Sequence, residues 1–248
     1  MMTAFAALTK TQFKVFLREP LAVFFGLVFP SVLLLVLGTA FPDATTPDPV
    51  FDGRTLVEVY APTSIVLGLA TVAVFLLPVA LGGDRERGIL RRLSTTPVHP
   101  RTFVGAHLAV QLAVVTVASI AAVAVGMVVF GVPFPKSIGW FIISFALGAI
   151  SLLAIGLLIG AVVPTANSGQ GIGMLLYFPL LFFAGVYIPL EVMPSGVQSI
   201  STYTPAGAAV RALSESWAGD IPQTSSLLVM GAYAIVAGSL AVVLFRWE

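Results

Sequence analysis

Six apolar runs, separated by more polar segments, occupy most of this 248-residue sequence. A helix needs about 20 apolar residues to cross the hydrocarbon layer of a membrane. Only 9% of the residues are charged, against about 25% in a typical soluble domain. The sequence therefore predicts an all-α integral membrane protein with six transmembrane helices, built as a single domain over residues 1–248. The expected spans are 21–40, 60–81, 103–130, 138–163, 171–187 and 226–245, of which the fifth is short and rich in Gly and Phe.

Basic residues are distributed unevenly between the two sides that six spans define. Cytoplasmic loops of membrane proteins carry an excess of Lys and Arg, and six spans place both termini on one side. With that side inside, nine basic residues are inner and three are outer. We therefore expect a multi-pass protein of the cell membrane with both termini in the cytoplasm. The inner set is Lys10, Lys14, Arg18, Arg85, Arg87, Arg91, Arg92, Arg101 and Arg246, and the outer set is Arg54, Lys136 and Arg211.

The first segment, 3–19, is not a span. Lys10, Lys14 and Arg18 recur every four residues and form one cationic stripe on a helix. This pattern predicts an amphipathic helix lying in the membrane interface, with these three cations contacting anionic lipid. The alternative is a cytoplasmic extension of the first span. The apolar side of the predicted interfacial helix consists of Phe5, Leu8, Phe13 and Phe16.

The segment 188–220 is too polar to span a membrane and too apolar for an ordinary loop. Pro194 and Pro205 stand where prolines open helices, which predicts two short helices over 195–202 and 206–218. With the short fifth span before it, this segment is expected to form a re-entrant hairpin at the extracellular face, buried in protein or facing water. The alternative is a structured extracellular loop.

Several classes of chemistry lack the residues they need. The three lysines follow Thr9, Phe13 and Pro135 rather than Gly, so the chain has no phosphate-binding P-loop. The absence of cysteine excludes disulfides and thiol catalysis. We expect no catalytic residues, no metal site and no nucleic-acid partner. The span centres lack ionisable residues, which disfavours proton-driven antiport. His107, near the inner end of the third span, is expected in the interface or packed between helices.

The segment between the second and third spans, 83–101, is the strongest concentration of positive charge. It holds five of the twelve Lys and Arg residues. Ile89, Leu90 and Leu93 supply an apolar surface beside the arginines, and protein interfaces are enriched in this combination. The alternative is a topology signal whose arginines contact lipid phosphates, and the two interpretations are compatible.

Two stretches resemble a known family. Residues 86–98, ERGILRRLSTTPV, are similar to the motif that follows the second span in the membrane subunit of ABC-2 type exporters, a group that includes daunorubicin-type drug and antibiotic export permeases. The residues from Gly185 to Pro189, with Pro194 and Pro205, resemble the family's pattern before the last span. The resemblance covers essentially the whole chain. Ile89 stands where the family commonly has Thr, and Arg91 where it commonly has Glu, so this loop is more basic than usual.

The resemblance implies a function. In the family, a short cytoplasmic coupling helix docks in a cleft of a separate ATPase subunit, which binds ATP and Mg; this chain itself would bind no cofactor. The expected assembly is a homodimer of this chain with two copies of the ATPase, and it would export an amphiphilic drug, antibiotic or lipid-like molecule. The implied coupling residues are Glu86, Arg87, Gly88, Ile89, Leu90, Arg91, Arg92 and Leu93. The implied path residues, from the first and fifth spans, are Phe24, Phe25, Phe29, Phe178, Phe182 and Phe183.

Three other functions stay open at this point. An ABC-2 permease for polysaccharide or another large polymer shares the architecture. A channel would need no ATPase partner. An intramembrane enzyme would need a Ser/His or paired-Asp constellation at membrane depth, and the sequence shows none.

Overall fold

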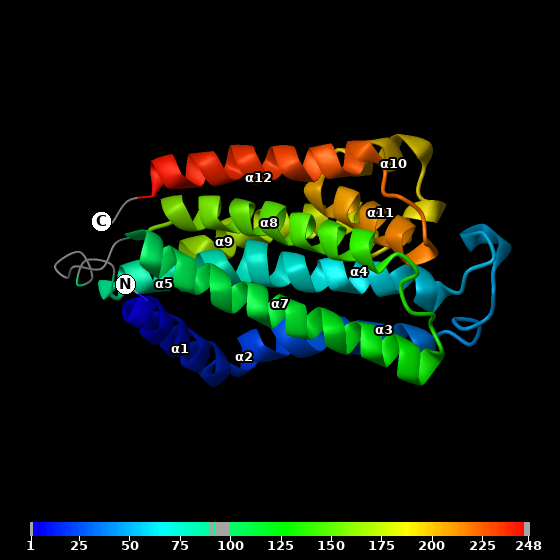
Figure 1. Cartoon of the computed structure of the whole chain (residues 1–248), viewed down its shortest axis with the longest axis horizontal. Helices are drawn as coiled ribbons and strands as arrows, with labels where there is room; N and C mark the ends of the chain where they lie inside the picture. Colours follow the sequence, from blue (N-terminus) through cyan, green and yellow to red (C-terminus); the bar gives the residue numbers. More distant parts are fainter. Residues whose placement is uncertain (1, 90–91, 93–99, 246–248) are drawn as a thin grey trace.

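The computed structural model describes residues 2–89, 92 and 100–245, and these residues are helical apart from short connections, with no strand among them. Figure 1 shows an elongated bundle whose long helices follow its longest axis. The start of α1 (Met2–Arg18) and the end of α12 (Thr224–Leu244) lie at the same end of the bundle. We call this the inner end. The opposite end, which carries the connection 41–55, is the outer end.

Two pairs of helices are joined without a break. A π-helical turn at Phe24–Val28 joins α2 to α3, and another at Thr71–Leu76 joins α4 to α5. Short 3₁₀ turns occupy Pro49–Phe51 and Leu190–Val192. The other helices are α2 (Pro20–Val23), α3 (Phe29–Ala40), α4 (Leu56–Ala70), α5 (Leu77–Glu86), α7 (Pro100–Phe130), α8 (Ile138–Val162), α9 (Ala166–Phe183), α10 (Ser195–Thr202) and α11 (Pro205–Ala218).

Five helices of the described chain are long and apolar enough to cross a membrane. They correspond to the first, second, third, fourth and sixth expected spans, which confirms five of the six segments as membrane-spanning candidates. The fifth expected span corresponds to α9, which is not among the five, so the total of six spans stays a prediction. The five are Pro20–Ala40, Leu56–Glu86, Arg101–Phe130, Ile138–Val162 and Thr224–Leu244.

α9 and α4 begin a few residues before the expected spans 171–187 and 60–81, because polar helix caps lie outside the apolar runs. The Thr165 hydroxyl accepts from the backbone N–H of Ser168 at 3.2 Å, so α9 begins at Ala166 with a polar first turn. Thr55 and Glu58 form a reciprocal capping box that starts α4 at Leu56. At the other end of α9, Gly185 adopts φ +80° and turns the chain away.

The second span lies at the centre of the bundle. Its most apolar window is 78% buried within the chain, compared with 17% for α12. Gly156 and Gly160 of α8 allow a close approach, since a Cβ on Gly156 would stand 1.7 Å from the Ala73 carbonyl oxygen, and one on Gly160 would stand 2.5 Å from Leu81. The G-x-x-x-G of α8 therefore serves helix packing within the chain.

The two short helices expected near the outer end are present. α10 has the predicted bounds, and α11 begins at Pro205, where the Thr204 hydroxyl accepts from the N–H of Gly207 at 3.1 Å. Small residues of α11 pack on α8, with the Ser144 hydroxyl 3.3 Å from that of Ser216. Re-entry of this segment into a membrane stays a prediction.

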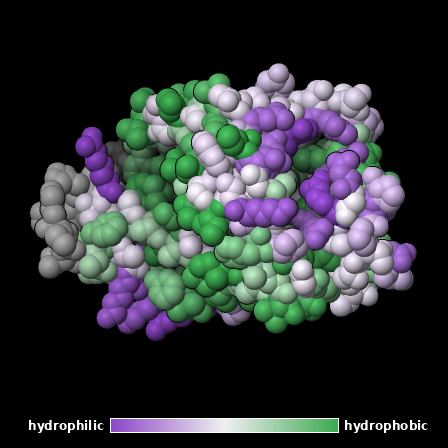
Figure 2. Space-filling model, turned by 45° about the vertical axis from the view of Figure 1, so that its right-hand side comes forward, coloured by the Kyte–Doolittle hydropathy of each residue, from purple (hydrophilic) through white to green (hydrophobic). Residues whose placement is uncertain are grey.

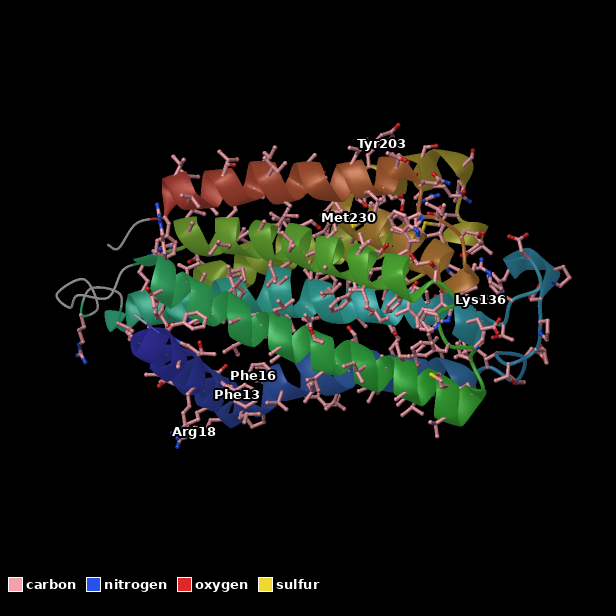
Figure 3. The ribbon with its side chains drawn as sticks, in the orientation of Figure 1. Phe13, Phe16, Arg18, Lys136, Tyr203 and Met230 are labelled. Atoms are coloured by element: carbon pink, nitrogen blue, oxygen red, sulfur yellow. The ribbon has the colours of Figure 1, made fainter. Side chains whose placement is uncertain are left out.

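α1 packs along α7 and is helical over nearly the expected range. Phe16 is buried, whereas Phe13 is 44% exposed, so the expected apolar side is only partly covered by protein. Lys10, Lys14 and Arg18 are exposed on the other side, and Figure 3 shows Arg18 pointing away from the bundle. This arrangement leaves both apolar and cationic surface of α1 uncovered by the chain.

Candidate coupling site at the inner end

Asp84, in the last turn of α5, links this helix to α7 and also pairs with Arg87. Asp84 is 5% exposed, and one of its carboxylate oxygens lies 3.0 Å from Nε2 of His107 in α7. The other oxygen accepts from the Arg87 guanidinium, also at 3.0 Å. The His107 ring is itself buried and meets the Phe103 ring edge-on, with centroids 4.8 Å apart. A buried carboxylate is stable only with such partners.

Arg85 links α5 to the end of α8. Its guanidinium donates to the carbonyl oxygens of Gly160 at 3.1 Å and Ala161 at 3.3 Å, and also to that of Val163. The last carbonyls of a helix have no partner within the helix and carry partial negative charge, so a cation is well placed there. The Arg85 guanidinium also lies 5.9 Å from the ring centroid of Phe245, just after α12.

Glu86 links α5 to the start of α9. Its Oε2 accepts from the backbone N–H of Ala166 at 3.1 Å, and negative charge is favoured at a helix N-terminus. The backbones also approach closely, because a Cβ on Gly82 would stand 2.4 Å from the Thr165 carbonyl oxygen. Any larger residue at Gly82 would push α9 away from α5.

Of the four consecutive residues 84–87, Asp84 joins α5 to α7, Arg85 joins it to α8 and to Phe245 after α12, Glu86 joins it to α9, and Arg87 pairs with Asp84. We call these four residues the inner cluster. They lie at the start of the 83–101 loop that the sequence singles out for partner docking, so the base of this loop is in contact with four other helical segments. Asp84, Arg85 and His107 were not among the expected site residues. Asp84 and His107 are 23 positions apart, and no sequence pattern indicated their pairing.

The structure places part of the expected coupling set. Glu86 and Arg87 end α5, and Gly88 follows with φ +68°, a left-handed conformation that favours glycine. Ile89 is half-buried against the core, and the N–H of Arg92 donates to the Gly88 carbonyl at 3.1 Å, as in a helical turn. Leu90, Arg91 and Leu93 lie outside the described residues.

The expected path residues form two groups on different helices. Phe24, Phe25 and Phe29 contact one another with ring centroids 5.2 to 6.2 Å apart. Phe182 and Phe183 form a pair at 5.4 Å on α9, and Phe178 stacks edge-on against Tyr177. Both groups adjoin α4, where Phe29 and Tyr177 pack around Leu67 and Ala70. Phe24, Phe25 and Phe178 are exposed, whereas Phe29, Phe182 and Phe183 are half-buried.

Comparison with known proteins gives consistent matches. A family model described as ABC-2 type transporter matches residues 3–216. The chain is 28% identical over 143 residues to the inner membrane transport permease YhhJ of Escherichia coli (strain K12), covering 57% of this chain and 38% of that protein. It is 26% identical over 145 residues to the probable multidrug ABC transporter permease YbhR of the same organism, covering 57% and 39%.

A third relative matches along nearly its whole length. The chain is 25% identical over 229 residues to the putative transport permease YvfS of Bacillus subtilis (strain 168), covering 91% of this chain and 90% of that protein. The chain therefore spans about two-fifths of YhhJ and YbhR and most of YvfS.

Proposed function

Because this chain belongs to the ABC-2 type transporter family, as the match over residues 3–216 shows, we propose that it is the membrane-spanning subunit of an ATP-driven exporter of amphiphilic small molecules. The observation that carries the proposal is the inner cluster, which connects the base of the 83–101 loop to α7, α8, α9 and the end of α12. A subunit without a P-loop needs such a connection to receive work from a partner.

The proposed mechanism begins on the ATPase. ATP draws two ATPase subunits together, and they push on the docked loop, whose apolar residues and arginines provide the contact. Arg87 moves with the loop, and the Asp84–His107 contact carries the displacement to α7. Arg85 carries it to the end of α8, and Glu86 to the start of α9. The helices then rearrange and release the substrate outward.

The proposed orientation places the inner end in the cytoplasm and α1 in the membrane interface. Phe13 is 44% exposed and Leu17 is 52% exposed, and they adjoin the stripe of Lys10, Lys14 and Arg18 on the same helix. Apolar side chains next to cations suit the boundary between acyl chains and anionic headgroups. α9 serves as the sixth span, with 188–220 re-entering from the outer face.

The proposed substrate is an amphiphile that meets aromatic side chains between two copies of this chain. The exposed rings of Phe24, Phe25 and Phe178 lie on the helices that the family resemblance assigns to the path. The likeness to YbhR, a probable multidrug ABC transporter permease, supports a drug-like substrate rather than a polymer. A second copy of the chain would cover these rings, which gives the homodimer a physical reason.

The test is co-purification followed by transport in reconstituted vesicles. We expect a nucleotide-hydrolysing protein to co-purify with the full chain, and the pair to move an amphiphilic dye only with ATP. Leu93→Asp should abolish both, because a charge replaces an apolar docking residue. Thr45→Asp, which adds the same charge in the exposed outer connection, should change neither. ATP-independent dye movement by the chain alone would indicate a channel instead.

A further inference from the structure

The outer end contains a cavity, lined in part by charged residues, that the proposed coupling mechanism does not use. Its volume is about 450 Å³, within the range of small-molecule sites. It lies among the connection after α3, the first half of α4, the Leu190–Val192 turn, α10 and α11. Figure 2 shows hydrophilic residues gathered over this end of the molecule. The charged residues that line the cavity are Asp52, Arg54, Glu191, Arg211, Glu215 and Asp220.

α11 presents two different faces, and one of them forms a wall of this cavity. Ala209, Ala212 and Ser216 face α8, as the contacts with Gly148 and Ser144 show. The residues of α11 that line the cavity instead recur at i, i+1, i+4, i+5 and i+8. They are Val210, Arg211, Ser214, Glu215 and Ala218. Packing of the alanine face on α8 therefore holds the polar face toward the cavity.

The two cations of the cavity differ in their partners. Arg54 forms an ion pair with Glu191 at 3.0 Å. Arg211 donates through Nη2 to the Gln198 carbonyl at 2.9 Å, but its Nε is buried and has no hydrogen-bond partner. Within the described residues, no carboxylate lies within 4.0 Å of the Arg211 guanidinium. A buried donor without an acceptor is unfavourable, so an acceptor that enters the cavity gains a prepared partner.

Two of the carboxylates that line the cavity also lack a cationic partner among the described residues. Glu215 and Asp220 form no ion pair among the described residues, and Glu215 accepts only the backbone N–H of Gln223, at 2.8 Å. Four acidic and two basic residues line the cavity, so a simple anion meets net repulsion. A simple cation leaves Arg211 unpaired. The described residues also include no group of three acidic or His side chains suited to a metal ion.

We propose that this cavity binds a small zwitterion, whose oxyanion pairs with Arg211 and whose protonated amine pairs with Glu215 and Asp220. Phosphoethanolamine has this chemistry, either as a free compound or as the headgroup of phosphatidylethanolamine. Arginine suits an oxyanion because its guanidinium offers paired donors. The site requires no ATPase, so it stands apart from the proposed transport function.

The experiment is calorimetric titration of the full chain, purified in detergent, with phosphoethanolamine, ethanolamine and inorganic phosphate. We expect saturable binding of phosphoethanolamine and weaker binding of the two single-charge probes. Arg211→Gln should weaken phosphoethanolamine binding by about tenfold or more, the effect of losing one charged hydrogen-bond partner. Glu215→Gln should weaken phosphoethanolamine binding without weakening phosphate binding. Lys136→Gln, a cation at the same end but outside the cavity lining, should bind like the unaltered chain.

Arg211→Lys distinguishes loss of the charge from a folding defect. It keeps the positive charge and should therefore retain more affinity for phosphoethanolamine than Arg211→Gln. Absence of saturable phosphoethanolamine binding, equal affinity for phosphate alone, or unchanged affinity in Arg211→Gln would each overturn the proposal. Nanodiscs separate the two sources of the ligand. Free phosphoethanolamine that binds in phosphatidylglycerol discs but not in phosphatidylethanolamine discs identifies the lipid headgroup as occupant. Binding in both identifies the free compound, and binding in neither overturns the site.

Discussion

The close approach of α8 to the second span at Gly156 predicts a large effect from a single added methyl group. A Cβ on Gly156 would stand 1.7 Å from the Ala73 carbonyl oxygen, whereas ordinary contacts begin at 3.4 Å. Relief requires α8 to move away from the Thr71–Leu76 turn, because a backbone carbonyl cannot rotate aside as a side chain can. Overpacking of this kind costs about 1–3 kcal/mol and sometimes more. We therefore expect Gly156→Ala to lower the free energy of unfolding by at least about 2 kcal/mol.

Gly231→Ala is the matched control. Gly231 lies inside α12, and a Cβ there would meet nothing within 4 Å. The same substitution then changes only helix propensity, which favours alanine by about 1 kcal/mol or less. The comparison therefore isolates the steric effect at Gly156.

Both variants are measured by titrating sodium dodecyl sulfate into mixed micelles and following helix content by circular dichroism. A free energy of unfolding for Gly156→Ala equal to or above that of Gly231→Ala would refute the close approach of α8 to the second span. Loss of stability in both variants to the same degree would point to a general effect of the substitution and count equally against it.

Three further outcomes test the inner cluster and a helix cap. Asp84→Ala should lower the free energy of unfolding by about 1–3 kcal/mol, because it leaves buried His107 without its partner. Adding His107→Phe should restore part of this loss. Strictly additive effects of the two substitutions in the same micelle titration would contradict the pairing. Glu86→Gln should lower the free energy of unfolding by about 0.3–1 kcal/mol, because it removes negative charge from the N-terminus of α9. Hydrogen exchange at the Ala166 amide should then become faster, and an unchanged exchange rate there would argue against the contact. Thr204→Ala should lower the free energy of unfolding by about 1 kcal/mol, and a stability equal to that of the unaltered chain would show that α11 does not depend on its cap.

Properties that depend only on residues close together in the sequence could be derived from the sequence. The apolar runs predicted five helices that the structure shows to be long enough to span a membrane, because length and hydropathy are local. Pro194 and Pro205 predicted α10 and α11 for the same reason, since proline acts on its own helix start. The 86–98 stretch also pointed to the family that the comparison with known proteins shows. The polar first turn of α9 was missed because a helix held by the Thr165 cap and the Glu86 carboxylate needs no apolar residues there.

Contacts between helices were decided by tertiary packing. Arg85 donates to carbonyl oxygens 75 to 78 positions further along the chain. A local sequence pattern predicts a positive charge on the inner side, but it does not predict which groups this charge contacts. Likewise, Gly156 was recognisable as a small residue, but only the packed bundle sets it against Ala73. The physical reason is that hydropathy and charge act on each segment separately and determine what enters lipid and on which side. Which helix meets which depends on shape complementarity summed over the whole bundle.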